Sequence, residues 1–152
     1  MLRQLLVGGA VSACNIGIHA LVMLALVRVA RGAHAKERSR PSLRLMAVMV
    51  ATVSTLMAAH VLEVVVWALA YAIVDAAPEG ADLLYFAFVN YTTLGYGDVI
   101  PVERWRLLGP MTAMNGVLLF GWSTAVIFEV LRRTMRSANT REWDSRDGRA
   151  AD

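Results

Sequence analysis

Residues 92–98, Thr-Thr-Leu-Gly-Tyr-Gly-Asp, combine residue types that suit the binding of a dehydrated cation. Glycine adopts left-handed backbone readily, so Gly95 and Gly97 allow successive carbonyl oxygens to point the same way. A row of carbonyls aimed at one axis replaces the water shell of a cation, and the Thr93 hydroxyl would add another oxygen. We expect Tyr96 to brace this segment from behind. The alternative, a glycine-rich surface turn, fits poorly because apolar segments long enough to cross a membrane flank it.

These seven residues resemble the selectivity-filter signature of potassium channels, T-x-x-T-x-G-Y-G-D, in which a branched apolar residue precedes the first glycine. Leu94 departs mildly from the commoner valine or isoleucine. The resemblance extends over residues 43–131 and implies potassium as the bound ion, with no other cofactor. The filter residues that it implies are Thr92, Thr93, Leu94, Gly95, Tyr96, Gly97 and Asp98. The carbonyl ligands of potassium would be those of Thr93, Leu94, Gly95 and Tyr96.

The composition predicts a single-domain membrane protein. The chain has 152 residues, of which 57% are hydrophobic, and a mean hydropathy of +0.51, too apolar for a soluble domain of this size. The single cysteine, Cys14, excludes an intrachain disulfide. The histidines and the cysteine are not at metal-ligand spacing along the chain, and no phosphate-binding loop or Ser-His-Asp set is present. We therefore expect no enzyme activity.

The amino-terminal segment, residues 1–31, predicts a first membrane helix. Its apolar run over residues 5–29 is long enough to cross a bilayer and too long for a typical cleaved signal peptide. Residues 32–42 form a basic loop, and short basic loops remain cytoplasmic. This loop lacks aromatic residues, so nucleic-acid binding is not expected. The amino terminus would then lie outside the cell membrane and the carboxyl terminus in the cytoplasm.

Residues 43–133 predict a pore domain that begins with an outer helix over residues 43–74, in which Trp67 and Tyr71 would anchor the outer interface. Asp82 is a good N-cap for a short apolar helix. The remaining predicted parts are a re-entrant pore helix at residues 83–92, a filter at 93–98, an inner helix at 107–131 and a disordered polar tail at 134–152.

The predicted inner helix carries a further resemblance to this channel family, G-x-x-x-F-G at Gly116, Phe120 and Gly121. Gly116 is either a bending point or a small residue for close helix packing. Thr124 matches a hydroxyl position that lines the cavity in many members. Glu129 either forms an acidic ring in the pore or pairs with the arginines that follow it.

Behind the filter, the family's pattern is altered. Many relatives have tryptophans where this chain has Tyr85 and Phe86, and some have a glutamate where it has Val89. We expect these three residues to support the filter, with the Tyr85 hydroxyl donating to Asp98.

Polar residues within the first two apolar spans require a separate explanation. One turn separates His60 from Glu63, and Asn15 and His19 lie at comparable depth in the first span. One interpretation is a hydrogen-bonded patch that joins the two helices. The other is a pH-sensitive gate, because histidine titrates near neutrality.

Together these features predict an all-α membrane protein with three transmembrane helices, a re-entrant pore helix and a filter loop, assembled as a homotetramer in the lipids of the cell membrane. Passive, potassium-selective conduction is the expected function. Two alternatives remain open: a less selective monovalent cation channel, and a non-conducting membrane sensor or accessory subunit with the same fold.

Overall fold

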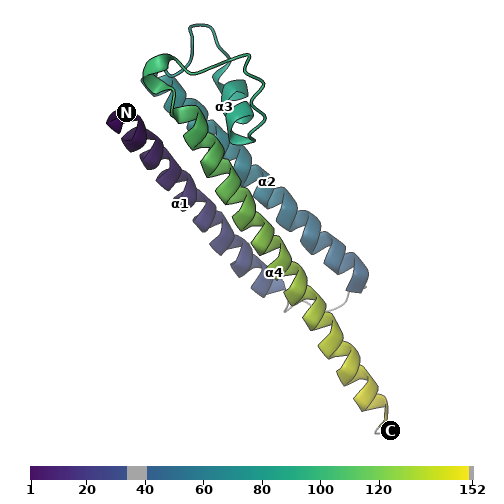
Figure 1. Ribbon diagram of the computed structural model, residues 1–152. Coiled ribbons are helices and arrows are strands. Elements are labelled where there is room, and N and C mark those ends of the chain that lie inside the picture. Colours follow the sequence, from purple (N-terminus) through teal and green to yellow (C-terminus); the bar gives the residue numbers. More distant parts are fainter. Residues whose placement is uncertain (34–40, 151–152) are drawn as a thin grey trace.

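A computed structural model describes residues 1–33 and 41–150 of the chain, so most of the predicted basic loop, residues 34–40, lies outside the described part. The described residues form four α-helices and one short 3-10 helix, with no strand among them (Figure 1). The elements are α1 (Leu2–Ala33), α2 (Pro41–Val74), α3 (Leu83–Tyr91), η1 (Glu103–Trp105) and α4 (Leu108–Ala150).

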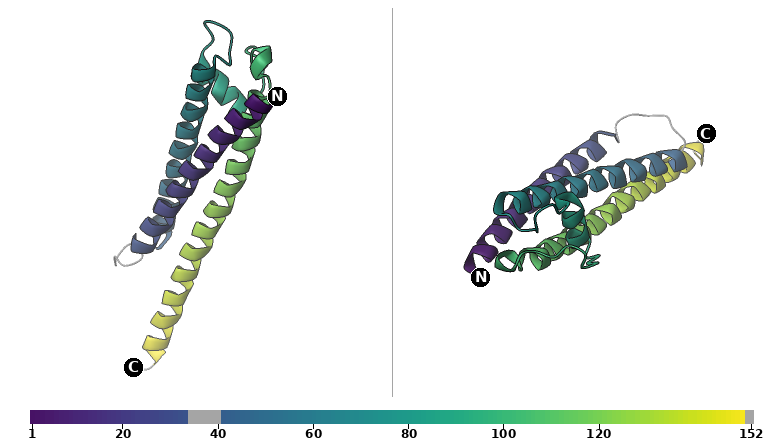
Figure 2. Two further views of the ribbon diagram at one scale, coloured as in Figure 1. Left: turned by 90° about the vertical axis from the view of Figure 1, so that its left-hand side faces the viewer. Right: turned by 90° about the horizontal axis from the view of Figure 1, so that it is seen from above.

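Three of these helices run side by side, and α2 runs opposite to α1 and α4 (Figures 1 and 2). Segments long and apolar enough to cross a membrane are Leu2–Val29, Leu45–Val74 and Glu103–Arg136. The short α3 lies at the end of the bundle where α1 and α4 begin. The prediction of an all-α protein with three spans is therefore confirmed.

Local sequence signals set the helix ends that position α3. The predicted N-cap is confirmed, because the Asp82 carboxylate accepts the backbone N–H groups of Leu84 at 3.0 Å and Tyr85 at 3.1 Å. Pro41 is the first residue of α2, where its missing N–H costs no helical bond. Pro110 lies in the first turn of α4 for the same reason.

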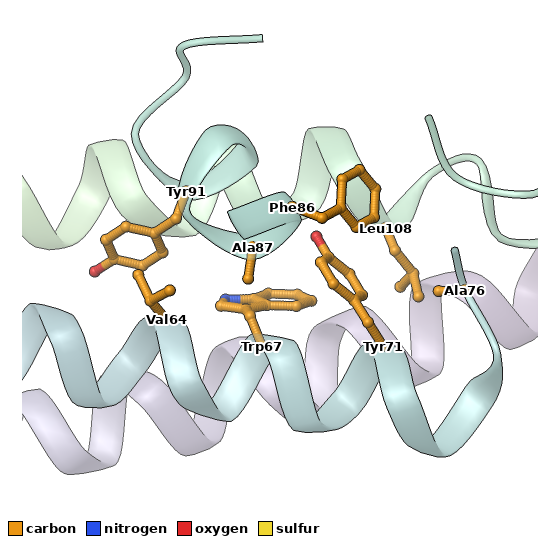
Figure 3. Close-up of a cluster of buried hydrophobic side chains, with 8 residues drawn as sticks. All are labelled: Val64, Trp67, Tyr71, Ala76, Phe86, Ala87, Tyr91 and Leu108. Atoms are coloured by element: carbon orange, nitrogen blue, oxygen red, sulfur yellow. The ribbon is translucent and has the colours of Figure 1, made fainter. Parts of the chain in front are cut away.

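The core that holds α3 is an aromatic cluster between α3 and α2 (Figure 3). Trp67 and Tyr71 project from one face of α2 and are fully buried, so the prediction that they anchor the membrane interface is wrong. The i, i+4 spacing places both side chains on the face that α3 covers. Their polar groups are satisfied within the bundle: the Trp67 N–H donates to Asn115 at 3.0 Å, and Tyr71 bonds to Thr112 at 2.6 Å.

The carboxyl-terminal segment also differs from expectation. Residues 134–150, predicted to be disordered, continue α4 as far as Ala150. No proline follows Pro110, and this segment contains four arginines, which favour helix.

Candidate ion-binding site

The backbone of the filter segment alternates in handedness. Thr93, Gly95 and Gly97 have φ angles of 61°, 59° and 79°, whereas Leu94 and Tyr96 between them do not have positive φ. Alternation between left-handed and right-handed backbone turns successive carbonyls toward one side of the chain. Thr93 has a positive φ despite its β-branched side chain. A β-branched residue rarely adopts this conformation, and it persists only where the surrounding structure holds it.

Hydrogen bonds to α3 fix which side the filter carbonyls face. The N–H groups of Leu94 and Gly95 both donate to the Val89 carbonyl, at 2.9 and 3.3 Å, and the Thr93 N–H donates to Asn90 at 3.0 Å. Within the described chain, the carbonyls of residues 93–96 accept no hydrogen bond. The amides are thus bonded to α3, and the carbonyl oxygens are left available to a cation.

Two of the predicted filter residues, Thr92 and Asp98, form hydrogen bonds through their side chains. The Thr92 hydroxyl donates to the Phe88 carbonyl at 2.7 Å and caps the end of α3. The Tyr85 hydroxyl donates to the Asp98 carboxylate at 2.7 Å, as expected from the sequence. This bond lowers the pKa of Asp98 below its ordinary value and raises the pKa of Tyr85.

Replacing Tyr85 by phenylalanine removes only the hydroxyl and leaves Asp98 without this donor. Because the pKa of Asp98 is lowered in the folded chain, the bond is present at neutral pH and is lost only as the pH falls through that value. We expect sustained ion flux through the variant to fall a few-fold at neutral pH. Asp98→Asn should have a similar effect, and the double variant should be no worse than either single one.

The other two support residues act from behind the filter. Phe86 is 1% exposed, and its ring lies 4.9 Å from that of Tyr71, so it packs against α2. Val89 is buried, and its carbonyl is the acceptor for the filter amides described above. Both residues therefore position α3, and neither side chain supplies a polar group to the filter.

Gly116 lies where α4 packs closely against Tyr91, the last residue of α3. A Cβ at this position would be 2.0 Å from the Tyr91 carbonyl oxygen. The helix continues through Gly116 without a break. In the conformation described, this geometry favours close helix packing at Gly116 over a bend. Farther along α4, Gly121 and Thr124 are exposed, and the Phe120 ring lies 4.6 Å from that of His60.

Glu129 pairs with the arginines that follow it. Its carboxylate lies 2.7 Å from Arg132 and also accepts from Arg133. The structure thus favours ion pairing within α4 as the role of this side chain, and its charge is offset by two cations.

The four predicted polar residues come together between the helices. Asn15, His19 and Glu63 are fully buried, and His60 is 12% exposed. Nδ1 of His19 lies 2.8 Å from one Glu63 oxygen, and Nδ1 of His60 lies 3.0 Å from the other. Asn15 donates to the Glu63 backbone carbonyl at 3.2 Å.

Sequence reasoning missed three members of this polar network. The Tyr91 hydroxyl donates to Glu63, Ser123 bonds to His60 at 2.9 Å, and Asn115 accepts from Asn15 at 3.1 Å. Asn115 and Ser123 are polar residues inside the third apolar span, and this position in the sequence could have indicated that they join the network. Ligand atoms of His19, His60 and Glu63 lie within 4.8 Å of one another, which is near enough for one cation. All three side chains already make hydrogen bonds, so we assign no metal to them.

A family model described as "Ion channel" matches residues 45–133. The match covers most of α2, all of α3 and the apolar part of α4, and it leaves α1 outside. No curated protein and no solved structure matches the chain.

Proposed function

Because the chain belongs to the ion channel family of two-span pores, we propose that it is a potassium-selective channel whose pore is closed by four copies of the chain. The observation that carries the proposal is the alternating backbone of residues 93–97, with amides bonded to α3 and carbonyls unengaged. Carbonyl oxygens in this arrangement replace the hydration shell of potassium in filters of this type.

The need for further copies follows from what one chain leaves uncovered. The filter side chains Leu94 and Tyr96 are 52% and 70% exposed in the single chain. Irregular backbone at membrane depth is tolerated only where protein covers it or where it lines water. Four copies around one axis would meet both conditions. In such an assembly α1, which lies outside the matched region, would sit at the periphery in contact with lipid.

The chain is a multi-pass membrane protein, and we propose that its amino terminus lies outside and its carboxyl terminus in the cytoplasm. This orientation follows from the basic residues that precede α2 and those in the last third of α4.

Ion flux from purified protein in liposomes tests the function directly. We expect potassium efflux at least tenfold faster than sodium efflux under matched gradients. Equal rates for the two ions would instead support a less selective cation pore.

The Tyr96 hydroxyl, which makes no hydrogen bond within the described chain, is the feature that favours this second candidate, the less selective cation pore. Absence of any flux from correctly assembled protein would contradict both channel proposals. Crosslinking in mild detergent should stop at the four-chain species.

A further inference from the structure

Five hydrogen-bonding side chains, one or more from each of α1, α2, α3 and α4, form a polar cluster that includes none of residues 92–98. We call it the Glu63 cluster. Its members are His19 of α1, His60 and Glu63 of α2, Tyr91 of α3 and Ser123 of α4. The rings of Trp122 and Phe120 cover its histidines. Buried polar groups in lipid must be satisfied from within the protein, so the hydrogens in this cluster can be counted.

The carboxylate of Glu63 fixes the direction of three bonds. An ionised carboxylate only accepts, so His19, His60 and Tyr91 each donate to it. The Nδ1–H of His60 is shared with the Tyr91 oxygen, which lies 2.9 Å away and has given its own hydrogen to Glu63. A neutral histidine that donates from Nδ1 presents a lone pair at Nε2. Both Nε2 atoms face the same hydroxyl, Ser123 Oγ, at 2.9 Å from His60 and 3.3 Å from His19. Because serine has one O–H, it can satisfy only one of the two lone pairs.

One additional proton removes this conflict. If one histidine is an imidazolium, its Nε2–H donates to Ser123, and the serine O–H donates to the other histidine. Every nitrogen and oxygen in the cluster then has a partner, and the imidazolium and carboxylate charges cancel. A second proton would leave the serine O–H without an acceptor and give the buried cluster a net positive charge, which is costly in an apolar environment.

We propose that the Glu63 cluster is a binding site for a single shared proton, whose occupancy is transmitted to the filter through Tyr91. Tyr91 is the last residue of α3, its hydroxyl donates to Glu63, and Thr92 and the filter follow it directly. Loss of the proton leaves a net negative charge and an unpaired imidazole nitrogen among four helices. The ion pair between a histidine and Glu63 then becomes an ordinary hydrogen bond, and Ser123 loses one of its two bonds. The carboxylate that accepts from Tyr91 is held less firmly against α1 and α4, so the conducting arrangement is favoured when the proton is bound.

Nitrogen-15 NMR of the histidines, on the protein in lipid nanodiscs, counts the proton directly. The third histidine, His34, lies outside the described residues, and His34→Ala removes its signal. The titration runs from about pH 5 to pH 10, which brackets the ordinary titration ranges of histidine and tyrosine. Over this range we expect His19 and His60 together to lose one proton, whose imidazolium signal is shared between the two rings. Two independent full titrations would overturn the proposal.

Glu63→Gln is the sharpest variant, because the amide can donate to one histidine and accept from the other. All bonds are then satisfied without the extra proton, so both histidines should stay neutral across this range. Glu79→Gln, in an exposed loop, is the matched control and should titrate like the unmodified protein. An imidazolium that persists in Glu63→Gln would contradict the shared-proton site.

Ser123→Ala removes the hydroxyl that both histidines share. We expect its titration midpoint to move down by about one pH unit, since hydrogen bonds to charged groups contribute roughly that much. Thr134→Ala is the control on the same helix, because its hydroxyl bonds only to the preceding turn at Val130. If both variants give the midpoint of the unmodified protein, Ser123 does not hold the proton site.

The effect on conduction rests on the proposed function and has its own readout. Potassium flux should fall several-fold as the pH rises through the NMR midpoint, and Glu63→Gln should show no such dependence. A protein that titrates as expected but never conducts would refute the channel and leave the proton site standing. If Zn²⁺ binds one per chain, and His19→Ala and His60→Ala abolish this binding, the site takes a metal ion and the proton assignment is overturned.

Discussion

Gly95→Ala is expected to abolish selective potassium flux while leaving the protein folded. Gly95 has a φ of +59°, and an added Cβ would meet nothing nearer than the Thr93 carbonyl oxygen at 3.9 Å. The penalty is therefore one of backbone conformation, about 1–2 kcal/mol for a residue with a side chain in left-handed backbone. Four copies would repeat it around one axis. The strain is relieved if the residue turns to negative φ, which rotates a carbonyl away from the ion.

Gly80→Ala supplies a control with the same strain in a different place. Gly80 has a φ of +80° with open space around it and lies in the loop between α2 and α3. Its alanine variant should keep the ratio of potassium to sodium flux of the unmodified protein. Gly95→Ala should lower that ratio at least tenfold or lose flux altogether. If both variants conduct with unchanged selectivity, the alternating backbone at Gly95 is not what selects the ion.

Short-range chemistry explains which features could be predicted from the sequence. A helix cap depends on a side chain and the next few amides, so Asp82 was sufficient to place the start of α3. The three spans follow from run length and hydropathy alone. The contact between Tyr85 and Asp98 was expected because the resemblance to the channel family aligns the two positions.

The remaining features depend on how the helices are rotated against one another, which a hydropathy pattern does not specify. Trp67 and Tyr71 lie near a membrane interface by sequence position, but the aromatic face of α2 turns toward α3 and buries them. Ser123 completes the Glu63 cluster from a helix more than sixty residues away in sequence from His60. In a membrane helix that is apolar all round, no amphipathic stripe indicates which face will contact which neighbour.

Helix packing also decides the role of Gly116, and Gly116→Ala is expected to disrupt the junction between α4 and the filter. The new Cβ would lie 2.0 Å from the carbonyl oxygen of Tyr91 and 3.0 Å from its carbonyl carbon. Backbone atoms cannot rotate away as a side chain can, so α4 and the end of α3 must separate. Overpacking of this kind typically costs about 1–3 kcal/mol, occasionally more. Tyr91 would be displaced, and with it the residues that begin the filter.

A lower melting temperature of Gly116→Ala in detergent, together with loss of potassium flux, is the expected result. Gly17→Ala is the matched control, because Gly17 is also within a helix and has nothing within 4 Å of an added Cβ. It should leave flux unchanged and stabilise the protein slightly, since alanine is favoured over glycine in helices by about 0.5–1 kcal/mol. If Gly116 acts only as a hinge, Gly116→Ala should change potassium flux and leave the melting temperature unchanged. That combination would show that the close contact with Tyr91 is dispensable and that α4 bends at this residue instead.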